Sequence, residues 1–412
     1  MREMKDSGLQ WAGNIPQCWN IEKGKHFMAV LERPVRDDDG VITCFRNGEV
    51  TLRSNRREDG FTVATVEAGY QGIEPGDLVI HGMDGFAGAI GISDSRGKGT
   101  PALNILNCSE NKKYIMYHLR AMAYTEVFMA LSTGIRVRTC DTNWKKLRSL
   151  DYLIPPANEQ QRIADFLDAK CAEIDALVTD IQTQIDTLEQ YKRSVITETV
   201  TKGLNPDAEM KDSGVFYMAP MNATWRLTKI GYICSKLSRS FAPEDTALIC
   251  SNKGKVQVRA DDLTGIMVSD DNAMQGIRSG DIAIHGMDTW HGAIALSEYD
   301  GKITRVVHVC DSTEDKRFIV YYMQHLAFQG VYKLISNGVR GNTSDFRSWD
   351  KVCDIWIAIP ETKEEQAAIC DYLDSQCTAV EEVIATKKEQ LEVLGEYKKS
   401  LIFEYVTGKK EV

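Results

Sequence analysis

The chain has 412 residues, which is enough for two or three domains of ordinary size. Its composition, 43% hydrophobic and 26% charged, is typical of a globular protein and excludes disordered, collagen-like and mucin-like chains. The net charge of −10 leaves a nucleic-acid partner open, because residues 156–202 carry −4 of it and residues 361–412 carry −5. The remainder is close to neutral and can still present a basic face to DNA.

Membrane and secreted classes are disfavoured as well. No apolar run approaches the ~18 residues that a membrane span needs, and the polar N-terminus lacks the apolar core of a signal peptide. The eleven cysteines are scattered singly without a C-x-x-C pair, which argues against a disulfide framework or a zinc ribbon. We therefore expect a cytoplasmic protein with reduced cysteines.

Residues 1–155 are predicted to form a mixed α/β domain. Short β-branched or aromatic runs, such as Gly60–Val66 and Asp77–Ile80, are bounded by turn residues and predict several short strands. The segment Lys112–Leu131 predicts a helix within this domain.

Residues 156–203 are predicted to form one long coiled-coil helix. No Pro or Gly follows Pro156 until Gly203, and apolar residues recur every seven positions with a second set between them. About 40 helical residues would extend roughly 60 Å. The seven-residue stripe consists of Leu167, Ile174, Ile181, Leu188 and Val195.

The rest of the chain repeats this organisation. The offset between matching segments changes only from 204 to 206, so the chain is one duplicated unit of about 205 residues rather than a short-period solenoid. We therefore expect a second domain over residues 204–360, with a helix at Lys316–Ile335, and a second long helix over residues 361–412. The matching segments are Met4–Gly8 and Met210–Gly214, Trp19 and Trp225, Gly76–Asp84 and Gly280–Asp288, Gly134–Arg136 and Gly338–Arg340, and Phe166–Asp168 and Tyr372–Asp374.

The two long helices are expected to pack on each other. The stripe of the second helix is interrupted by Lys387, and neither stripe can stay exposed to water. Similar units that pair through similar surfaces are related by a pseudo-two-fold axis, which makes the helices antiparallel and suggests a molecular ruler. The alternative, in which each helix lies on its own domain, stays open. The stripe of the second helix consists of Leu373, Val380, Leu394 and Leu401.

Catalytic signatures are missing from the sequence. The segment around Lys98 does not fit a P-loop, and we find no nucleophile elbow, H-E-x-x-H, zinc-deaminase or amino-methyltransferase motif. The nuclease-like triplets Glu361–Lys363 and Glu396–Lys398 fall at or within the second helix, where side chains two residues apart point apart. We expect no catalytic residue, metal site or cofactor site in this chain.

The segments His81–Asp84 and His285–Asp288 are the most ligand-like feature. A His and an Asp three residues apart could bind a metal or act as acid and base. A tight turn whose Asp caps backbone N–H groups is the favoured interpretation, and Gly85 and Gly88 support it. Contact with DNA from this turn is the next alternative.

Basic and amide side chains gather in loop-like segments of both halves. Arg and Lys neutralise phosphates, Arg recognises guanine, and Asn recognises adenine. The equivalent loops that contain Arg136 and Arg340 stand out because Arg follows Gly at the same spacing; a solvated surface explains the other clusters equally well. The candidate DNA-binding residues are Arg53, Asn55, Arg56, Arg57, His81, Arg136, Arg138, Lys145, Lys253, Lys255, His285, Arg340, Asn342 and Arg347.

These elements together resemble the specificity subunits of type I restriction-modification enzymes over the whole chain. The opening Lys5–Gly8 with Trp19, and Ile154–Pro156 followed by Glu159–Gln160 and Phe166–Asp168, carry the resemblance. The second unit repeats it with Ile359–Pro360, Glu365–Gln366 and Tyr372–Asp374, although Met218 and Pro220 replace an expected Trp and Gly.

The resemblance implies a non-catalytic subunit that recognises DNA. Each globular domain would be a target recognition domain for one half of a split, asymmetric site in double-stranded DNA. The helices would fix the spacer between the half-sites and dock two modification (methyltransferase) subunits, which in turn bind restriction subunits. S-adenosylmethionine, ATP and Mg²⁺ would belong to those partners, and no membrane is implied.

Two other classes remain as alternatives. One is a self-contained site-specific methyltransferase or nuclease, which the missing motifs disfavour. The other is a coiled-coil protein–protein scaffold with no DNA role.

Overall fold

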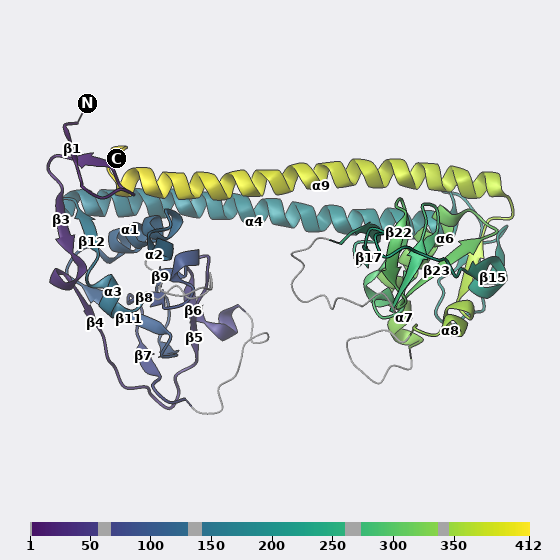
Figure 1. Cartoon of the computed structure of the whole chain (residues 1–412), viewed down its shortest axis with the longest axis horizontal. Helices are drawn as coiled ribbons and strands as arrows, with labels where there is room; N and C mark the ends of the chain where they lie inside the picture. Colours follow the sequence, from purple (N-terminus) through teal and green to yellow (C-terminus); the bar gives the residue numbers. More distant parts are fainter. Residues whose placement is uncertain (1, 57–66, 131–141, 260–272, 337–345) are drawn as a thin grey trace. The chain divides into compact units, whose positions relative to one another are not determined.

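The computed structural model describes residues 2–56, 67–130, 142–259, 273–336 and 346–412 (Figure 1). The chain divides into two compact units, Met1–Ile181 with Lys388–Val412 (unit 1), and Gln182–Lys387 (unit 2). The unit boundaries fall within the two long helices, so each unit holds one globular domain and a part of both helices. Within the described residues, none of the helices combines the length and the apolar character that a membrane span requires.

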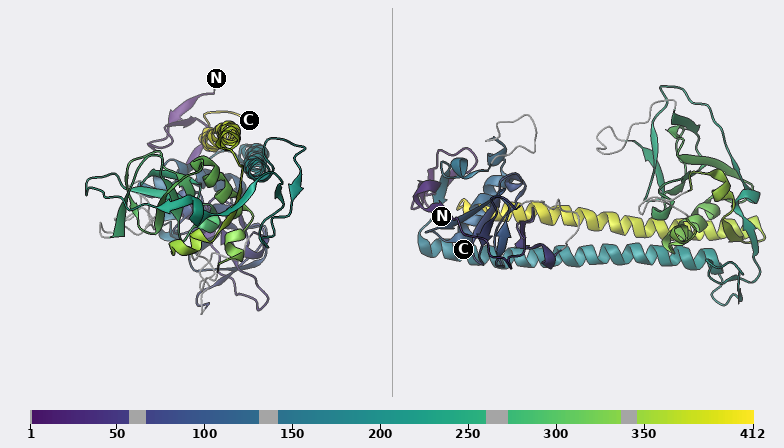
Figure 2. Two further views of the ribbon diagram at one scale, coloured as in Figure 1. Left: turned by 90° about the vertical axis from the view of Figure 1, so that its right-hand side faces the viewer. Right: turned by 90° about the horizontal axis from the view of Figure 1, so that it is seen from below.

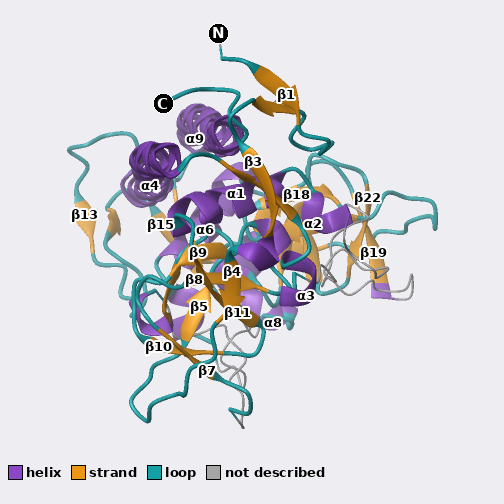
Figure 3. Ribbon diagram, turned by 90° about the vertical axis from the view of Figure 1, so that its left-hand side faces the viewer, coloured by secondary structure: helices purple, strands orange, loops and turns teal. Residues whose placement is uncertain are grey.

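Unit 1 is built around a four-stranded antiparallel sheet in the order β4-β11-β8-β9. The central strand β8 has a continuous apolar run, Leu78–Ile80, that is fully buried because one face of the sheet packs on helix α1 and the other on a smaller apolar cluster. Figure 3 shows these strands beside α1. The strands of unit 1 are β1 (Met4–Asp6), β2 (Asn14–Pro16), β3 (Asn20–Lys23), β4 (Met28–Val30), β5 (Ile42–Cys44), β6 (Val50–Leu52), β7 (Gln71–Ile73), β8 (Leu78–His81), β9 (Ile90–Ile92), β10 (Gly97–Gly99), β11 (Leu103–Cys108) and β12 (Asp151–Ile154).

Unit 2 has the same sheet, with the order β16-β23-β20-β21. Its strand β20 is again a continuous apolar run that ends in a histidine, and helix α6 packs against β21. The strands of unit 2 are β13 (Met210–Lys211), β14 (Met221–Asn222), β15 (Arg226–Lys229), β16 (Cys234–Lys236), β17 (Leu248–Ser251), β18 (Lys255–Val258), β19 (Met274–Ile277), β20 (Ile282–His285), β21 (Ile294–Leu296), β22 (Gly301–Thr304), β23 (Val307–Ser312) and β24 (Trp356–Ile359).

The single helices predicted at 112–131 and 316–335 are each broken in two. In unit 1 the break falls at Glu126, whose φ of 60° is left-handed. In unit 2 it falls at Gly330, with a φ of 71°. A left-handed residue cannot continue a right-handed helix. The short helices are α1 (Lys112–Tyr124), α2 (Val127–Ala130), α3 (Trp144–Leu147), α5 (Ile230–Ile233), α6 (Lys316–Phe328), α7 (Val331–Leu334) and α8 (Trp349–Cys353), with 3₁₀ turns η1 (Gly24–His26), η2 (Arg53–Asn55), η3 (Gly85–Ala87) and η5 (Thr289–His291).

The two long helices are α4 (Ala157–Lys202) and α9 (Lys363–Val406). They pair antiparallel in each unit, since partner numbers on α9 fall as numbers on α4 rise (Figure 2). In unit 1, Phe166 lies against Tyr405 with ring centroids 4.5 Å apart, and Lys398 bonds Asp175 at 2.6 Å. In unit 2, Lys387 donates to Gln184 and Lys192 to Glu381. The residue that interrupts the second stripe is therefore a polar cross-link between the helices.

The heptad stripe is buried unevenly. Leu167, Ile174 and Leu401 belong to the core of unit 1, and Leu373 belongs to the core of unit 2. Ile181 and Leu188, farther from the globular domains in sequence, are only half-buried. Other helix residues, Ile185, Val380 and Ile384, are buried although they belong to neither domain core, so the helices bury part of the apolar face without those cores. Both expected arrangements therefore occur together: the helices pack on each other and also on the domains.

The Glu-Gln pair at the start of each long helix fastens that helix to its domain. Glu159 accepts a bond from Trp19 Nε1 at 3.1 Å, and Glu365 accepts one from Trp225 Nε1 at 2.9 Å. The next residue, Gln160, accepts the backbone N–H of Asn111 at 3.0 Å, just before α1. These contacts give the repeated Trp and Glu-Gln motifs a structural role.

Candidate nucleic-acid interface

The His-Gly-Met-Asp segment of unit 1 is a tight turn between β8 and η3. His81 Nδ1 accepts the backbone N–H groups of Met83 at 3.3 Å and Asp84 at 3.1 Å. The Asp84 carboxylate makes no capping bond to the 3₁₀ turn that follows it. The prediction of a turn is confirmed, but the Asp was assigned the wrong role: the imidazole caps the turn, because its Nδ1 reaches N–H groups two and three residues ahead.

The turn of unit 2 has the same geometry. His285 Nδ1 accepts the N–H of Met287 at 3.3 Å and of Asp288 at 3.1 Å. Since Nδ1 accepts in both turns, the neutral ring carries its proton on Nε2. Burial lowers the pKa of both His81 and His285 below the usual range, against the smaller opposing effect of the nearby Asp. Each ring is therefore a neutral hydrogen-bond donor near pH 7, and this arrangement does not suit a general base.

The β5–β6 hairpin of unit 1 brings Arg46 to this turn. Arg46 donates from Nε and Nη2 to Asp84 Oδ1 at 3.2 and 2.7 Å, while its side chain stays 60% exposed. The sequence patterns did not single out Arg46. A superposition of the two repeats would have indicated it, since it stands two residues before the hairpin glycine Gly48.

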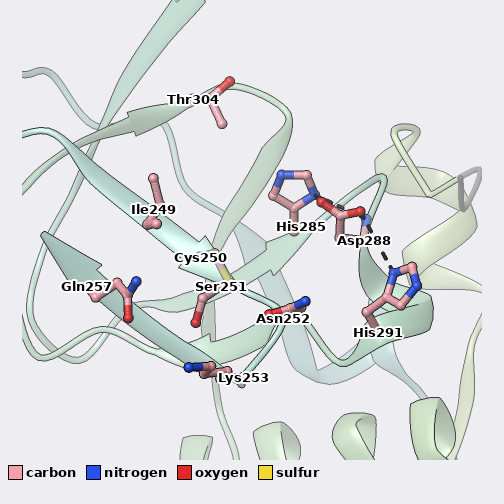
Figure 4. A pocket seen from close by; sticks show the side chains of 10 residues that line it. All are labelled: Ile249, Cys250, Ser251, Asn252, Lys253, Gln257, His285, Asp288, His291 and Thr304. Atoms are coloured by element: carbon pink, nitrogen blue, oxygen red, sulfur yellow. Dashed lines mark hydrogen bonds and ion pairs between the residues drawn. The ribbon is translucent and has the colours of Figure 1, made fainter. Parts of the chain in front are cut away.

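In unit 2 the equivalent turn borders a hollow of about 530 Å³ between β17–β18 and η5. Figure 4 shows Asn252 and Lys253 at the hairpin tip and His291 beside Asp288. The Asp288 carboxylate lies 3.4 Å from His285 Nδ1 and 4.0 Å from His291 Nδ1. Asn252 and His291 are further candidates that the sequence patterns missed.

Several predicted residues of unit 1 lie around the same hairpin. Arg53 donates to Thr43 Oγ1 at 3.0 Å, and Asn55 donates to Thr51 Oγ1 at 2.9 Å. Arg56 stacks on the Phe45 ring at 4.2 Å and pairs with Glu49 at 3.2 Å. These bonds hold η2 against the hairpin, so these side chains have structural contacts whether or not DNA is bound.

The predicted lysines and Arg347 have mixed positions. Lys145 is exposed on α3, Lys253 is exposed at the hairpin tip, and Arg347 is exposed next to Phe346. Lys255 instead pairs with Glu381 on α9 at 2.6 Å, so its charge is already matched within unit 2.

In both units, the first described residue after an undescribed segment donates a backbone hydrogen bond to this turn. Thr142 N donates to Gly82 O at 3.0 Å, and Phe346 N donates to Gly286 O at 3.0 Å. The predicted residues Arg57, Arg136, Arg138, Arg340 and Asn342 lie outside the described residues, so their assignment to DNA stays a prediction.

The described residues offer neither a metal site nor a disulfide. No group of three or more His, Cys, Asp or Glu side chains there is arranged to hold a metal ion. The described cysteines are all free thiols, and burial raises the pKa of Cys44 and of Cys250 to about 12, which leaves both thiols protonated and unreactive.

The chain is similar in sequence to the putative type I restriction enzyme MjaX specificity subunit of Methanocaldococcus jannaschii. The two are 23% identical over 249 residues, and this region covers 53% of each, so the chain spans about half the length of the curated relative that it matches. No protein-family model matches the chain.

One solved structure shows the same fold, and a second is a weaker match. A chain from a study of complex assembly and conformational transition of the type I R-M system superposes with a TM-score of 0.67 at 13% identity, over 96% of this chain and 99% of that one. The HsdS subunit of Thermoanaerobacter tengcongensis matches with a TM-score of 0.45 at 14% identity, over 96% and 98% of the two chains. The resemblance to specificity subunits that the sequence motifs predicted is confirmed.

Proposed function

We propose that this protein is the DNA sequence-recognition subunit of a type I restriction-modification complex. Each globular domain recognises one half of a bipartite, asymmetric target in double-stranded DNA. One observation carries the proposal: the same turn and hairpin occur in both units, with Arg46 at the tip of one and Asn252 at the tip of the other. A shared scaffold with different polar tips is what two unlike half-sites require.

The long helices serve two further purposes in this proposal. Antiparallel helices related by a pseudo-two-fold axis would set the spacer between half-sites and would offer equivalent surfaces to two modification subunits. The docking role is supported by apolar side chains exposed at equivalent positions of α4 and α9. These are Leu177 and Val383, and Tyr191 and Tyr397, each 45–53% exposed.

Catalysis and its cofactors would reside in the partners. In this proposal the modification subunits bind S-adenosylmethionine, and the restriction subunits use ATP and Mg²⁺. The chain itself contributes DNA contacts and two docking surfaces. The likeness to specificity subunits and the missing catalytic motifs support this division.

The test is DNA binding by the chain purified with its modification partner. Selection from a random-sequence duplex library should yield a bipartite motif with two unlike halves separated by a fixed gap. Recovery of no motif, with the assembled complex intact, would leave the alternative of a coiled-coil scaffold. Transfer of labelled methyl groups by the chain alone would contradict the non-catalytic assignment.

A further inference from the structure

In both units the hairpin contacts the strand that leads into the turn, β8 in unit 1 and β20 in unit 2, in the same way. Cys44 Sγ donates to Val79 O at 3.9 Å in unit 1, and Cys250 Sγ donates to Ala283 O at 3.8 Å in unit 2. The hairpin glycine has a left-handed φ in both, 87° in one and 69° in the other. These contacts align the two hairpins residue by residue.

The hairpin tips are also tied to the domain core at the same place. Arg120 of α1 donates to Gly48 O at 2.9 Å and Ile90 O at 2.8 Å. In unit 2, Gln324 of α6 donates to Ile294 O at 2.7 Å. In each domain, one helix side chain thus bonds both the hairpin glycine and the neighbouring strand, β9 or β21, which fixes the tip on the domain.

This alignment pairs Arg46 with Asn252 and Asp84 with Asp288. In unit 1 the carboxylate is matched by the guanidinium of Arg46. Among the described residues of unit 2, the groups beside the Asp288 carboxylate are the imidazoles of His285 and His291 rather than a guanidinium, and the Asp288 side chain is 47% exposed beside the hollow. Within the described residues, the amide of Asn252 makes no hydrogen bond, and Figure 4 shows it among the side chains that line the hollow, as His291 does.

The two tips have the chemistry of two different base contacts. Because Nε and Nη2 of Arg46 hold Asp84, the edge formed by Nη1 and Nη2 remains as a two-pronged donor. That fork matches O6 and N7 of guanine, whereas an Asn amide offers one donor and one acceptor and matches N7 and N6 of adenine. A carboxylate that already orients an arginine also reduces the side-chain entropy that the arginine loses when it binds DNA.

We propose that the hairpin tip is a base-reading position in each unit, an inference that rests on the proposed function: Arg46, oriented by Asp84, recognises a guanine in one half-site, and Asn252, beside Asp288, recognises an adenine in the other.

The first experiment uses the chain assembled with its modification partner and determines the preferred motif by selection from a duplex library. Arg46→Asn should abolish the guanine preference at one position of one half-site and leave the other half-site unchanged. Affinity for the original target should fall about 5- to 150-fold, the range of one bidentate base contact. Arg46→Lys should lose most of the preference too, because it keeps the charge without the fork.

The second experiment exploits the open carboxylate in unit 2. Asn252→Arg should pair with Asp288 as Arg46 pairs with Asp84, and should change the preferred base at one position of the second half-site from adenine to guanine. Asn252→Ala should relax that position without a new preference. Lys23→Asn, which removes an exposed ion pair with Asp151 on the β3–β12 ladder, is the control and should alter no motif position.

Each outcome is decisive. An unaltered motif in Arg46→Asn and Asn252→Arg would overturn the inference while the wild-type motif still upheld the proposed function. Equal weakening on all sequences, with a smaller salt dependence, would identify Arg46 as a phosphate contact and would also overturn it. A wild-type complex without any sequence preference would instead reject the proposed function. Misfolding is not expected from Arg46→Asn, because unit 2 already carries Asn at the equivalent tip position, beside an Asp whose described neighbours are histidines.

Discussion

Three buried histidines, His118, His308 and His325, predict an acid-labile fold, because burial lowers the pKa of each, and His118 in α1 is the sharpest case. Its side chain is fully buried, and burial lowers its pKa to about 3. Nε2 accepts the backbone N–H of Leu153 in β12 at 3.0 Å. Protonation would place a charge in the core and would turn that acceptor into a second donor facing Leu153 N–H.

The magnitude follows from linkage. An unfolded chain binds the proton near pH 6.5, whereas the folded chain resists it until about pH 3, so stability is full above pH 6.5 and falls as the pH is lowered through this window. At about 1.36 kcal/mol per pH unit, the loss at pH 4.5 is about 2.7 kcal/mol relative to neutral pH. His325 in unit 2, whose pKa burial lowers to about 4, predicts a separate loss of the same sign.

The assay compares wild type with His118→Gln at pH 7 and pH 4.5. Gln can still accept from Leu153 N–H but does not titrate, so the variant should retain about 2.7 kcal/mol more of its neutral-pH stability than wild type does. Amide exchange at Leu153, corrected for intrinsic rates, reports this locally, and denaturant unfolding reports it globally. His26→Gln, at an exposed histidine of η1, is the matched control. Equal loss in wild type and His118→Gln would refute the argument from burial.

Three further predictions concern packing and the helices. Glu159→Leu should destabilise the chain by about 1–3 kcal/mol, because it leaves the buried Trp19 Nε1–H without its acceptor, and an unchanged melting temperature would contradict this. Gly91→Ala should destabilise the chain by at least about 2 kcal/mol, because the added Cβ would lie 2.0 Å from Gly48 O. Gly395→Ala in α9, where a Cβ would meet nothing within 4 Å, should instead stabilise the chain by about 1 kcal/mol. The opposite order of melting temperatures would be inconsistent with the packing. Four residues inserted after Ile181 in α4 and after Lys387 in α9 should lengthen each helix by about 6 Å and the recognised spacer by about two base pairs; an active variant whose methylated motif keeps the old spacer would reject the ruler.

The sequence predicted the fold best where a regular spacing of apolar residues is compatible with a single type of secondary structure. The heptad stripe predicted both long helices, since their periodicity is fixed by burial along one face. The breaks at Glu126 and Gly330 were missed because the apolar pattern continues through α2 and α7. Backbone conformation at one residue ended each helix, and hydrophobic periodicity carries no information about it.

The candidate site shows a similar division. Spacing located the His-Gly-Met-Asp turn in both halves, but the role of its Asp depended on Arg46, 38 residues earlier in the chain. Lys255 had the sequence context of a DNA contact, yet Glu381, more than 100 residues away, matches its charge. Pairings across such separations depend on how strands cross in the fold, so a local pattern of basic residues overestimates the number of cations that remain available.

Under the proposed function, the placement of the missed residues would explain how one scaffold recognises two different half-sites. The contacts that hold the hairpin are made by the backbone of its strands, by Cys44 or Cys250 and by a side chain of α1 or α6. The tip residues Arg46 and Asn252 contribute nothing to those bonds, so in the proposed function a substitution there would alter base recognition at little cost in stability. If the proposed function holds, each copy of the duplicated domain could change the base that it recognises while both copies keep the same fold, which is the property that an asymmetric target requires of a tandem repeat.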